Sequence, residues 1–170
     1  VMANPVTAML PDDPAVRFLG DPGDTIHLFP EVLDSGHLWP GFSTENFGPA
    51  LLGPRPSISY TLTGVTGLNG AEDGRAVVYG SPATAGSRNA VLFDSEEPFP
   101  QSYTVGTGTH AHANWAFSAS GQYCLSITVR TQLPDGLTVR GPSQLTAWTG
   151  DPARASEIVP RDRTGHSELA

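Results

Sequence analysis

Two histidines, His110 and His112, are one residue apart in the stretch His-Ala-His-Ala-Asn-Trp-Ala-Phe at 110–117. Side chains alternate between the two faces of a β-strand, so both imidazoles would lie on one face, about 7 Å apart along the strand. Neutral imidazole nitrogens are common ligands of zinc and of other divalent transition metals. This spacing predicts a metal site to which one strand contributes two ligands.

Such a site needs further ligands, because a structural zinc site has four protein ligands and a catalytic one has three plus water. His37 and Glu45 are the first candidates, since both belong to a long loop around Trp39 that could fold over a sheet face. An alternative interpretation is that the two histidines are hydrogen-bonded structural residues that bind no metal. Weaker candidates for accessory ligands are His27, Glu31, Asn114 and Cys124.

The residues around the histidine pair predict the strands that position it. Alternation over 110–117 points Trp115 and Phe117 into a core and leaves the histidines on a non-core face. In the next apolar strand, 122–133, Tyr123 points inward and Cys124 outward. We expect these two strands to form a hairpin through 119–121.

The whole chain has the pattern of a β protein. About eight short β-rich segments are separated by turn signals, and none has a helical apolar period over ten or more residues. We predict an all-β fold, an Ig-like (Greek-key) β-sandwich with a long N-terminal loop. Residues 1–15 should be an irregular lead-in, 16–149 the sandwich, and 150–170, rich in charge, a flexible tail or linker.

Composition excludes two classes of partner. The chain has 170 residues with 17 acidic and 9 basic side chains, all nine of them Arg, and a net charge of −8. A nucleic-acid partner is excluded, because such binding depends on basic side chains that neutralise phosphates. No hydrophobic run exceeds four residues, whereas a membrane-spanning helix needs about 20, so no membrane span is expected in this chain.

Known catalytic patterns are missing from the sequence. There is no Gly-x-Ser-x-Gly elbow of a serine hydrolase, and no predicted helix follows the Gly-Thr-Gly at 106–108 to bind a phosphate. A copper oxidase would need several histidine clusters, and this chain has one pair and three scattered histidines. We therefore expect a protein that is not an enzyme, neither an oxidase nor a hydrolase.

Three blocks of sequence resemble the choice-of-anchor M domain, the actinobacterial surface-anchored, ABC-transporter-associated repeat family. They are Gly-Asp-Thr-Ile-His-Leu-Phe-Pro-Glu at 23–31, Gly-His-Leu-Trp-Pro-Gly-Phe-Ser-Thr-Glu at 36–45 and Gly-Thr-His-Ala-His-Ala-Asn-Trp-Ala-Phe at 108–117. The resemblance extends over about residues 16–149. It departs from the family pattern at His27, Glu31 and His37, so these three are not inherited as ligands.

The resemblance implies an exported, extracellular domain at the cell surface, associated with ABC transporters of the zinc and manganese type. We expect the export signal and the anchor to lie outside this chain, because neither a signal segment nor a sorting signal is visible in it. Within the matching blocks, the resemblance points to His110 and His112, together with Asn114, Trp115, Trp39 and Glu45.

The leading hypothesis is an extracytoplasmic, non-enzymatic metal-binding domain with zinc as the first choice of ion and manganese or copper as alternatives. Its partners would be components of a metal ABC transporter. Binding should weaken as the pH falls to about 6.5 and below, the ordinary imidazole pKa, because only the neutral ring is a ligand. The alternative is a surface adhesion or scaffold module that binds a protein or cell-wall glycan, with a structural histidine pair.

Overall fold

The computed structural model describes residues 2–33, 36–47, 57–82 and 89–158. Within these ranges the chain forms eleven strands and two short 3-10 helices, η1 (Arg17–Leu19) and η2 (Pro152–Glu157). The strands are β1 (Val6–Met9), β2 (Thr25–Phe29), β3 (Gly41–Ser43), β4 (Ser57–Leu68), β5 (Ala76–Gly80), β6 (Ala90–Asp94), β7 (Gln101–Gly106), β8 (His110–His112), β9 (Asn114–Phe117), β10 (Gln122–Gln132) and β11 (Thr138–Trp148).

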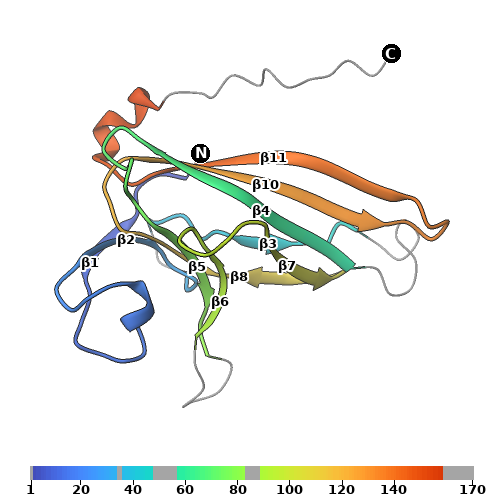
Figure 1. Cartoon of the computed structure of the whole chain (residues 1–170), viewed down its shortest axis with the longest axis horizontal. Coiled ribbons are helices and arrows are strands. Elements are labelled where there is room, and N and C mark those ends of the chain that lie inside the picture. Colours follow the sequence, from blue (N-terminus) through green and yellow to red (C-terminus); the bar gives the residue numbers. More distant parts are fainter. Residues whose placement is uncertain (1, 34–35, 48–56, 83–88, 159–170) are drawn as a thin grey trace.

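The strands form three antiparallel sheets. One has five strands in the order β1-β2-β9-β5-β6, and a second has four in the order β11-β10-β4-β7 (Figure 1). A two-stranded sheet, β3-β8, carries the histidine pair. The predicted all-β sandwich is confirmed, while the Ig-like Greek-key topology stays a prediction that this strand order does not confirm.

The main core joins the sheets through aromatic side chains. Trp115 and Phe117 of β9 and Tyr123 of β10 are each at most 3% exposed in one cluster. The rings of Phe117 and Tyr123 lie 4.6 Å apart between centroids. Phe42 of β3 stacks on Trp115 at 5.8 Å, so the two-stranded sheet is packed onto the same core. Each such buried ring contributes about 1.5–3 kcal/mol to stability.

The predicted hairpin between the histidine strand and the next strand is wrong. The second half of the histidine stretch, β9, pairs with β2 and β5, whereas β10 pairs with β4 and β11. Residues 119–121 therefore cross from one sheet to the other. The physical reason is that both strands are apolar on their inner faces, and these faces bury more surface packed across the core than side by side in one sheet.

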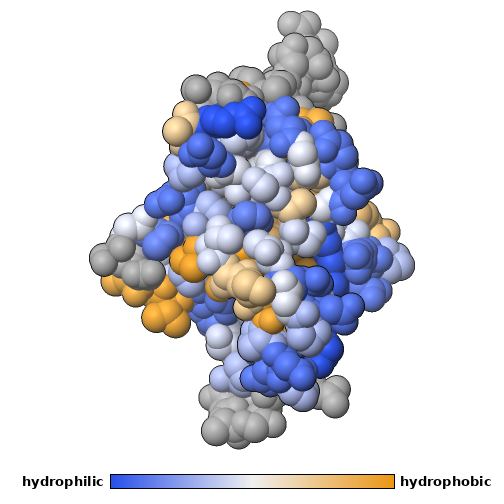
Figure 2. All heavy atoms as spheres, turned by 90° about the vertical axis from the view of Figure 1, so that its left-hand side faces the viewer, coloured by the Kyte–Doolittle hydropathy of each residue, from blue (hydrophilic) through white to orange (hydrophobic). Residues whose placement is uncertain are grey.

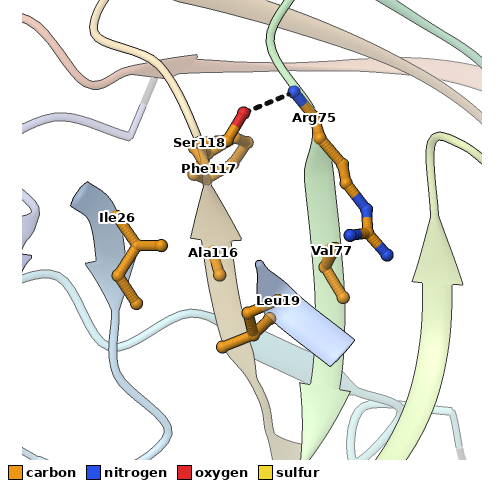
Figure 3. A pocket seen from close by; sticks show the side chains of 7 residues that line it. All are labelled: Leu19, Ile26, Arg75, Val77, Ala116, Phe117 and Ser118. Carbon is orange, nitrogen blue, oxygen red and sulfur yellow. Dashed lines mark hydrogen bonds between the residues drawn. The ribbon is translucent and has the colours of Figure 1, made fainter. Parts of the chain in front are cut away.

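The N-terminal segment is more regular than the predicted lead-in. Strand β1 pairs with β2 as the edge of the five-stranded sheet, and Met2 forms an isolated parallel bridge with Ala147. Leu10 and Leu19 cover the outer face of this sheet in a second core. Figure 3 shows Leu19 beside side chains of three strands; those strand residues are Ile26 of β2, Val77 of β5 and Ala116 of β9.

This second core changes the interpretation of the histidine-bearing face. By strand alternation Ala116 shares that face with the histidines, yet it is only 3% exposed because the N-terminal segment lies over it. On the side of the molecule where this segment lies, hydrophobic residues reach the surface in a few separate groups among hydrophilic ones (Figure 2).

The first residues of the predicted C-terminal tail form a short helix. Within the predicted tail at 150–170, η2 starts at Pro152, and the Asp151 side chain accepts a hydrogen bond from the Ala153 amide. The Trp148 indole donates to the Asp151 carbonyl at 2.9 Å, which ties the helix to β11. Residues 159–170 lie outside the described part of the chain. Among the residues described, no helix has the length and apolar character to span a bilayer.

Candidate metal centre

The histidine stretch divides between two sheets at Ala113. Its first half, β8, pairs with β3, and its second half, β9, joins the five-stranded sheet. Ala113 is completely buried at the division, and its amide donates to the Pro40 carbonyl at 3.4 Å. The loop around Trp39 thus folds back onto the histidine strand, as its sequence suggested it could.

A buried threonine holds the end of β3 in place beside His110. The Thr44 amide donates to the Thr109 carbonyl at 2.8 Å, and the Thr109 amide donates to the Thr44 hydroxyl at 2.9 Å. Thr44 is 0% exposed, although its neighbour Glu45 is open to solvent. This anchoring places the Glu45 carboxylate next to the His110 ring.

The two imidazoles meet through their Nε2 atoms, which are 2.8 Å apart. Their other ring nitrogens face oxygen acceptors. His110 Nδ1 lies 2.5 Å from Glu45 Oε2, and His112 Nδ1 lies 3.3 Å from the Pro40 carbonyl. The hydrogen bond from His110 lowers the pKa of the Glu45 carboxyl, which is therefore an ionised acceptor at neutral pH.

This arrangement determines where the protons can be. A carbonyl and a carboxylate only accept hydrogen bonds, so both oxygens are satisfied in the tautomer in which each Nδ1 carries a proton. In two neutral rings both Nε2 atoms would then present lone pairs to each other across 2.8 Å. Because two lone pairs repel at that distance, this tautomer is favoured only with a positive species between the two Nε2 atoms. That species can be a shared proton or a metal ion.

The donor set fits zinc. A metal-bound histidine almost always donates its second ring N–H to a carboxylate, a backbone carbonyl or water, and Glu45 and Pro40 supply the first two of these acceptors. Two nitrogens bound tetrahedrally to one zinc are about 3.3 Å apart, from Zn–N bonds of about 2.0–2.1 Å. Zinc binding by this pair would require the 2.8 Å separation of the Nε2 atoms to open to that value.

Trp39 fixes the plane of the His112 ring. The indole and the imidazole stack with centroids 3.4 Å apart and planes 4° from parallel. The indole N–H donates to the Glu31 carbonyl, so the ring is held at both its face and its edge. Trp39 remains 39% exposed, which leaves part of the indole open to solvent beside the two imidazoles.

Glu31 and Asn114 hold the start of the Trp39 loop. The Glu31 amide donates to Asn114 Oδ1 at 2.9 Å, and Asn114 Nδ2 donates back to Glu31 Oε2 at 3.0 Å. The Ser81 amide also donates to that carboxylate, at 2.7 Å. Asn114, only 8% exposed, therefore positions the segment that carries Trp39.

Gly41 and the Pro40 carbonyl are parts of the candidate site that the sequence interpretation missed. A Cβ at position 41 would collide with the Ala111 carbonyl and would lie 3.0 Å from His112 Nδ1. Only glycine lets the His112 ring lie this close to β3 and reach Pro40. The signal for it is the glycine in Trp-Pro-Gly, but its pairing with a histidine follows from strand register and is not visible in the sequence.

The other candidate ligands lie elsewhere or contribute no third ligand. Cys124 is 1% exposed in the four-stranded sheet, where its Sγ accepts a hydrogen bond from Gln122, so the expected outward placement beside the histidines is not observed. His27 lies on β2 against the Thr7 hydroxyl, and burial lowers its pKa. His37 belongs to the Trp39 loop. In the described residues, no group of three or more His, Cys, Asp or Glu side chains is placed to hold a metal ion.

Comparison with known proteins does not extend these findings. A scan of family models, a search of curated proteins and a search of solved structures each found no match to this chain. The resemblance of residues 16–149 to a cell-surface family therefore stays a prediction, and the function has to be inferred from the site itself.

Proposed function

We propose that this chain is a non-enzymatic domain that binds a divalent transition metal, zinc in the first place, through the Nε2 atoms of His110 and His112. One observation carries the proposal: the two Nε2 atoms face each other at 2.8 Å while both Nδ1 atoms are directed at oxygen acceptors. Two imidazoles that already have their outer hydrogen bonds are suited to receive a cation between them.

The chemistry of the donors supports zinc or copper over manganese. Imidazole nitrogen suits zinc and copper, whereas manganese prefers carboxylate, carbonyl and water oxygens. The nearest carboxylate, Glu45, contacts His110 Nδ1, the nitrogen that faces away from His112. In this role Glu45 orients a ligand instead of binding the metal, which differs from the direct ligation expected from the sequence.

An open, two-ligand site supports a role in metal capture and presentation. The side chain of His110 is 51% exposed, so an ion bound there can be reached by other ligands. In the single chain such a site can pass its ion to a second protein more readily than a site closed by four ligands of the same chain. The extracytoplasmic location and the metal ABC transporter as partner are supported by the family resemblance of residues 16–149.

The test is a calorimetric titration with zinc of the wild type and of the double variant His110→Ala/His112→Ala. Elemental analysis then measures the zinc bound per chain. We expect saturable binding at one zinc ion or less per chain in the wild type and its loss in the double variant. The matched control is His27→Ala, which removes a histidine from β2 and should leave zinc affinity unchanged. Equal affinity in the wild type and the double variant would exclude this site.

The exposed part of Trp39 supports a second candidate function. A planar indole that is 39% exposed and backed by a stacked imidazole is the kind of platform on which sugar rings and protein side chains pack. The chain would then be a surface adhesion or scaffold module with a structural histidine pair. Binding of cell-wall glycan that is unchanged by chelator and lost in Trp39→Ala would favour this function over metal binding.

A further inference from the structure

The candidate centre offers two ligands to a metal that needs four. Zinc in a closed protein site is bound tetrahedrally by four side chains. Here the described residues supply the two Nε2 atoms of His110 and His112, and no larger group of metal-binding side chains includes them. Nothing in the described part of the chain supplies the remaining ligands, which makes water or another molecule their candidate source.

The open side of the pair faces away from β3. Both Nδ1 atoms are directed at groups of the β3 segment, Pro40 and Glu45, and the Trp39 ring covers one face of His112. His110 and Glu45 are 51% and 53% exposed. A second molecule can therefore reach the exposed His110 side of the pair from solvent.

We propose that one zinc ion joins two copies of this chain, with His110 and His112 of each copy as its four ligands. This inference rests on the proposed function, since it assigns the missing ligands of the same site. In a twofold-symmetric dimer the same surface faces itself, so a site with two ligands in one copy has four in the pair. Four neutral imidazoles complete a tetrahedral zinc site without further groups.

Charge complementarity favours a second copy over water as the source of the ligands. One zinc ion carries two positive charges, and each copy brings one exposed Glu45 carboxyl group beside its His110. In the dimer two carboxyl groups lie near the two positive charges of one ion, whereas water ligands would bring no charge. Each chain carries a net charge of −8, so two copies repel each other when the ion is absent.

The experiment measures the oligomeric state of the full chain by sedimentation velocity, with chelator and with increasing zinc, alongside zinc stoichiometry. We expect a monomer in chelator, a dimer with one zinc ion per two chains, and a return to monomer when chelator is added again. His110→Ala/His112→Ala should stay monomeric at every zinc concentration that dimerises the wild type, and His27→Ala should dimerise like the wild type.

The outcomes separate this inference from the proposed function. A monomer that binds one zinc ion per chain through the histidine pair would overturn the dimer and leave the metal site standing. A chain that binds no zinc would overturn both. Zinc-dependent dimers that also form in the double variant would overturn the shared site, because the ligands would then lie elsewhere.

A second variant tests the geometry without removing a ligand. Leu38 is 44% exposed and adjoins Trp39, whose ring stacks on His112. Leu38→Asp adds a negative charge near the site in both copies, so zinc should still bind while the dimer forms only at higher protein concentration. Dimerisation that is undiminished in Leu38→Asp would overturn the proposed dimer, in which the histidine pairs of the two copies, and the Trp39 loops stacked on them, face each other.

Discussion

The Arg75–Asp94 pair and the cluster of His110, His112 and Glu45 are both held by polar contacts at hydrogen-bonding distance. They differ in how exposed their side chains are and in whether every donor faces an acceptor. In the first, Arg75 forms two hydrogen bonds with Asp94, from Nε at 2.9 Å and from a terminal nitrogen at 2.5 Å. Their side chains are 21% and 10% exposed. In the second, the side chains of His110 and Glu45 are each about half exposed.

In the first cluster donors and acceptors are matched, and in the second they are not. Each carboxylate oxygen of Asp94 faces a donor of Arg75, and one also accepts the Glu96 amide at 3.1 Å. The histidine pair instead directs two Nε2 atoms at one point. A polar cluster whose donors and acceptors match stabilises the fold, whereas one that needs an added cation is suited to binding.

The largest loss of stability should follow from breaking the Arg75–Asp94 ion pair. Asp94→Ala removes the main partner of Arg75, and each of the two charge-assisted hydrogen bonds lost costs about 1.5–3 kcal/mol. Urea unfolding measures the loss, and folded Asp94→Ala should still bind zinc like the wild type. Glu96→Gln is the control, because Glu96 is 67% exposed and its loss should cost less than about 1 kcal/mol. Equal losses in both variants would contradict the comparison.

Gly41→Ala should damage the histidine cluster by crowding it. The added methyl group collides with the Ala111 carbonyl and approaches His112 Nδ1, and such overpacking costs about 1–3 kcal/mol. Zinc affinity should fall as well, because the His112 ring is displaced from Pro40. The matched control is Gly80→Ala, since a Cβ there meets nothing within 4 Å. An unchanged zinc affinity in folded Gly41→Ala would show that this close approach is unimportant.

Glu45→Gln should weaken zinc binding with little effect on folding. A carboxylate that accepts the second N–H of a metal-bound histidine typically raises metal affinity by about 10–100-fold. Glu45 is exposed, so unfolding by urea should be almost unchanged. Calorimetric titration with zinc measures the affinity. If Glu45→Gln abolished binding as completely as the double histidine variant does, Glu45 would be a direct ligand, as expected from the sequence.

The smallest expected effect is the change in stability at acidic pH that depends on Asp94. Burial opposes ionisation of Asp94, but hydrogen bonds from Arg75 and from the Glu96 amide outweigh it and lower its pKa below the ordinary value of 3.8. A lowered folded-state pKa stabilises the protein above pH 3.8, and this stabilisation is lost as the pH falls through the folded value. The stability difference between the wild type and Asp94→Asn should therefore shrink below that pH in urea unfolding. A difference that stays constant to pH 2 would contradict it.

Much of the local structure was predictable because strand alternation depends on near neighbours. The strand expected at 122–133 is observed at Gln122–Gln132. The side chains expected to point inward, Trp115, Phe117 and Tyr123, lie in the main core. The pairing of strands was not predictable in the same way, since it depends on which apolar faces meet across the core.

In the candidate site, too, features set by near neighbours were predictable and features set by strand pairing were not. The spacing of His110 and His112 predicted that their side chains would share a face, and the Trp39 loop was expected near them. The use of each ring nitrogen, the Pro40 carbonyl and the need for glycine at position 41 follow from the register of β3 against β8. Cys124 could not be separated from the site by parity alone, because parity does not say which sheet a strand joins.

The sequence by itself determined the strand pattern, the acidic charge and the two imidazoles on one face, because these depend on residues a few positions apart. Only the tertiary structure decided that the N-terminal segment covers Ala116 and that β9 and β10 belong to different sheets. It also decided that Glu45 meets His110 across 65 positions of chain. Such contacts follow from the burial of apolar surface by the whole chain, which no local spacing encodes.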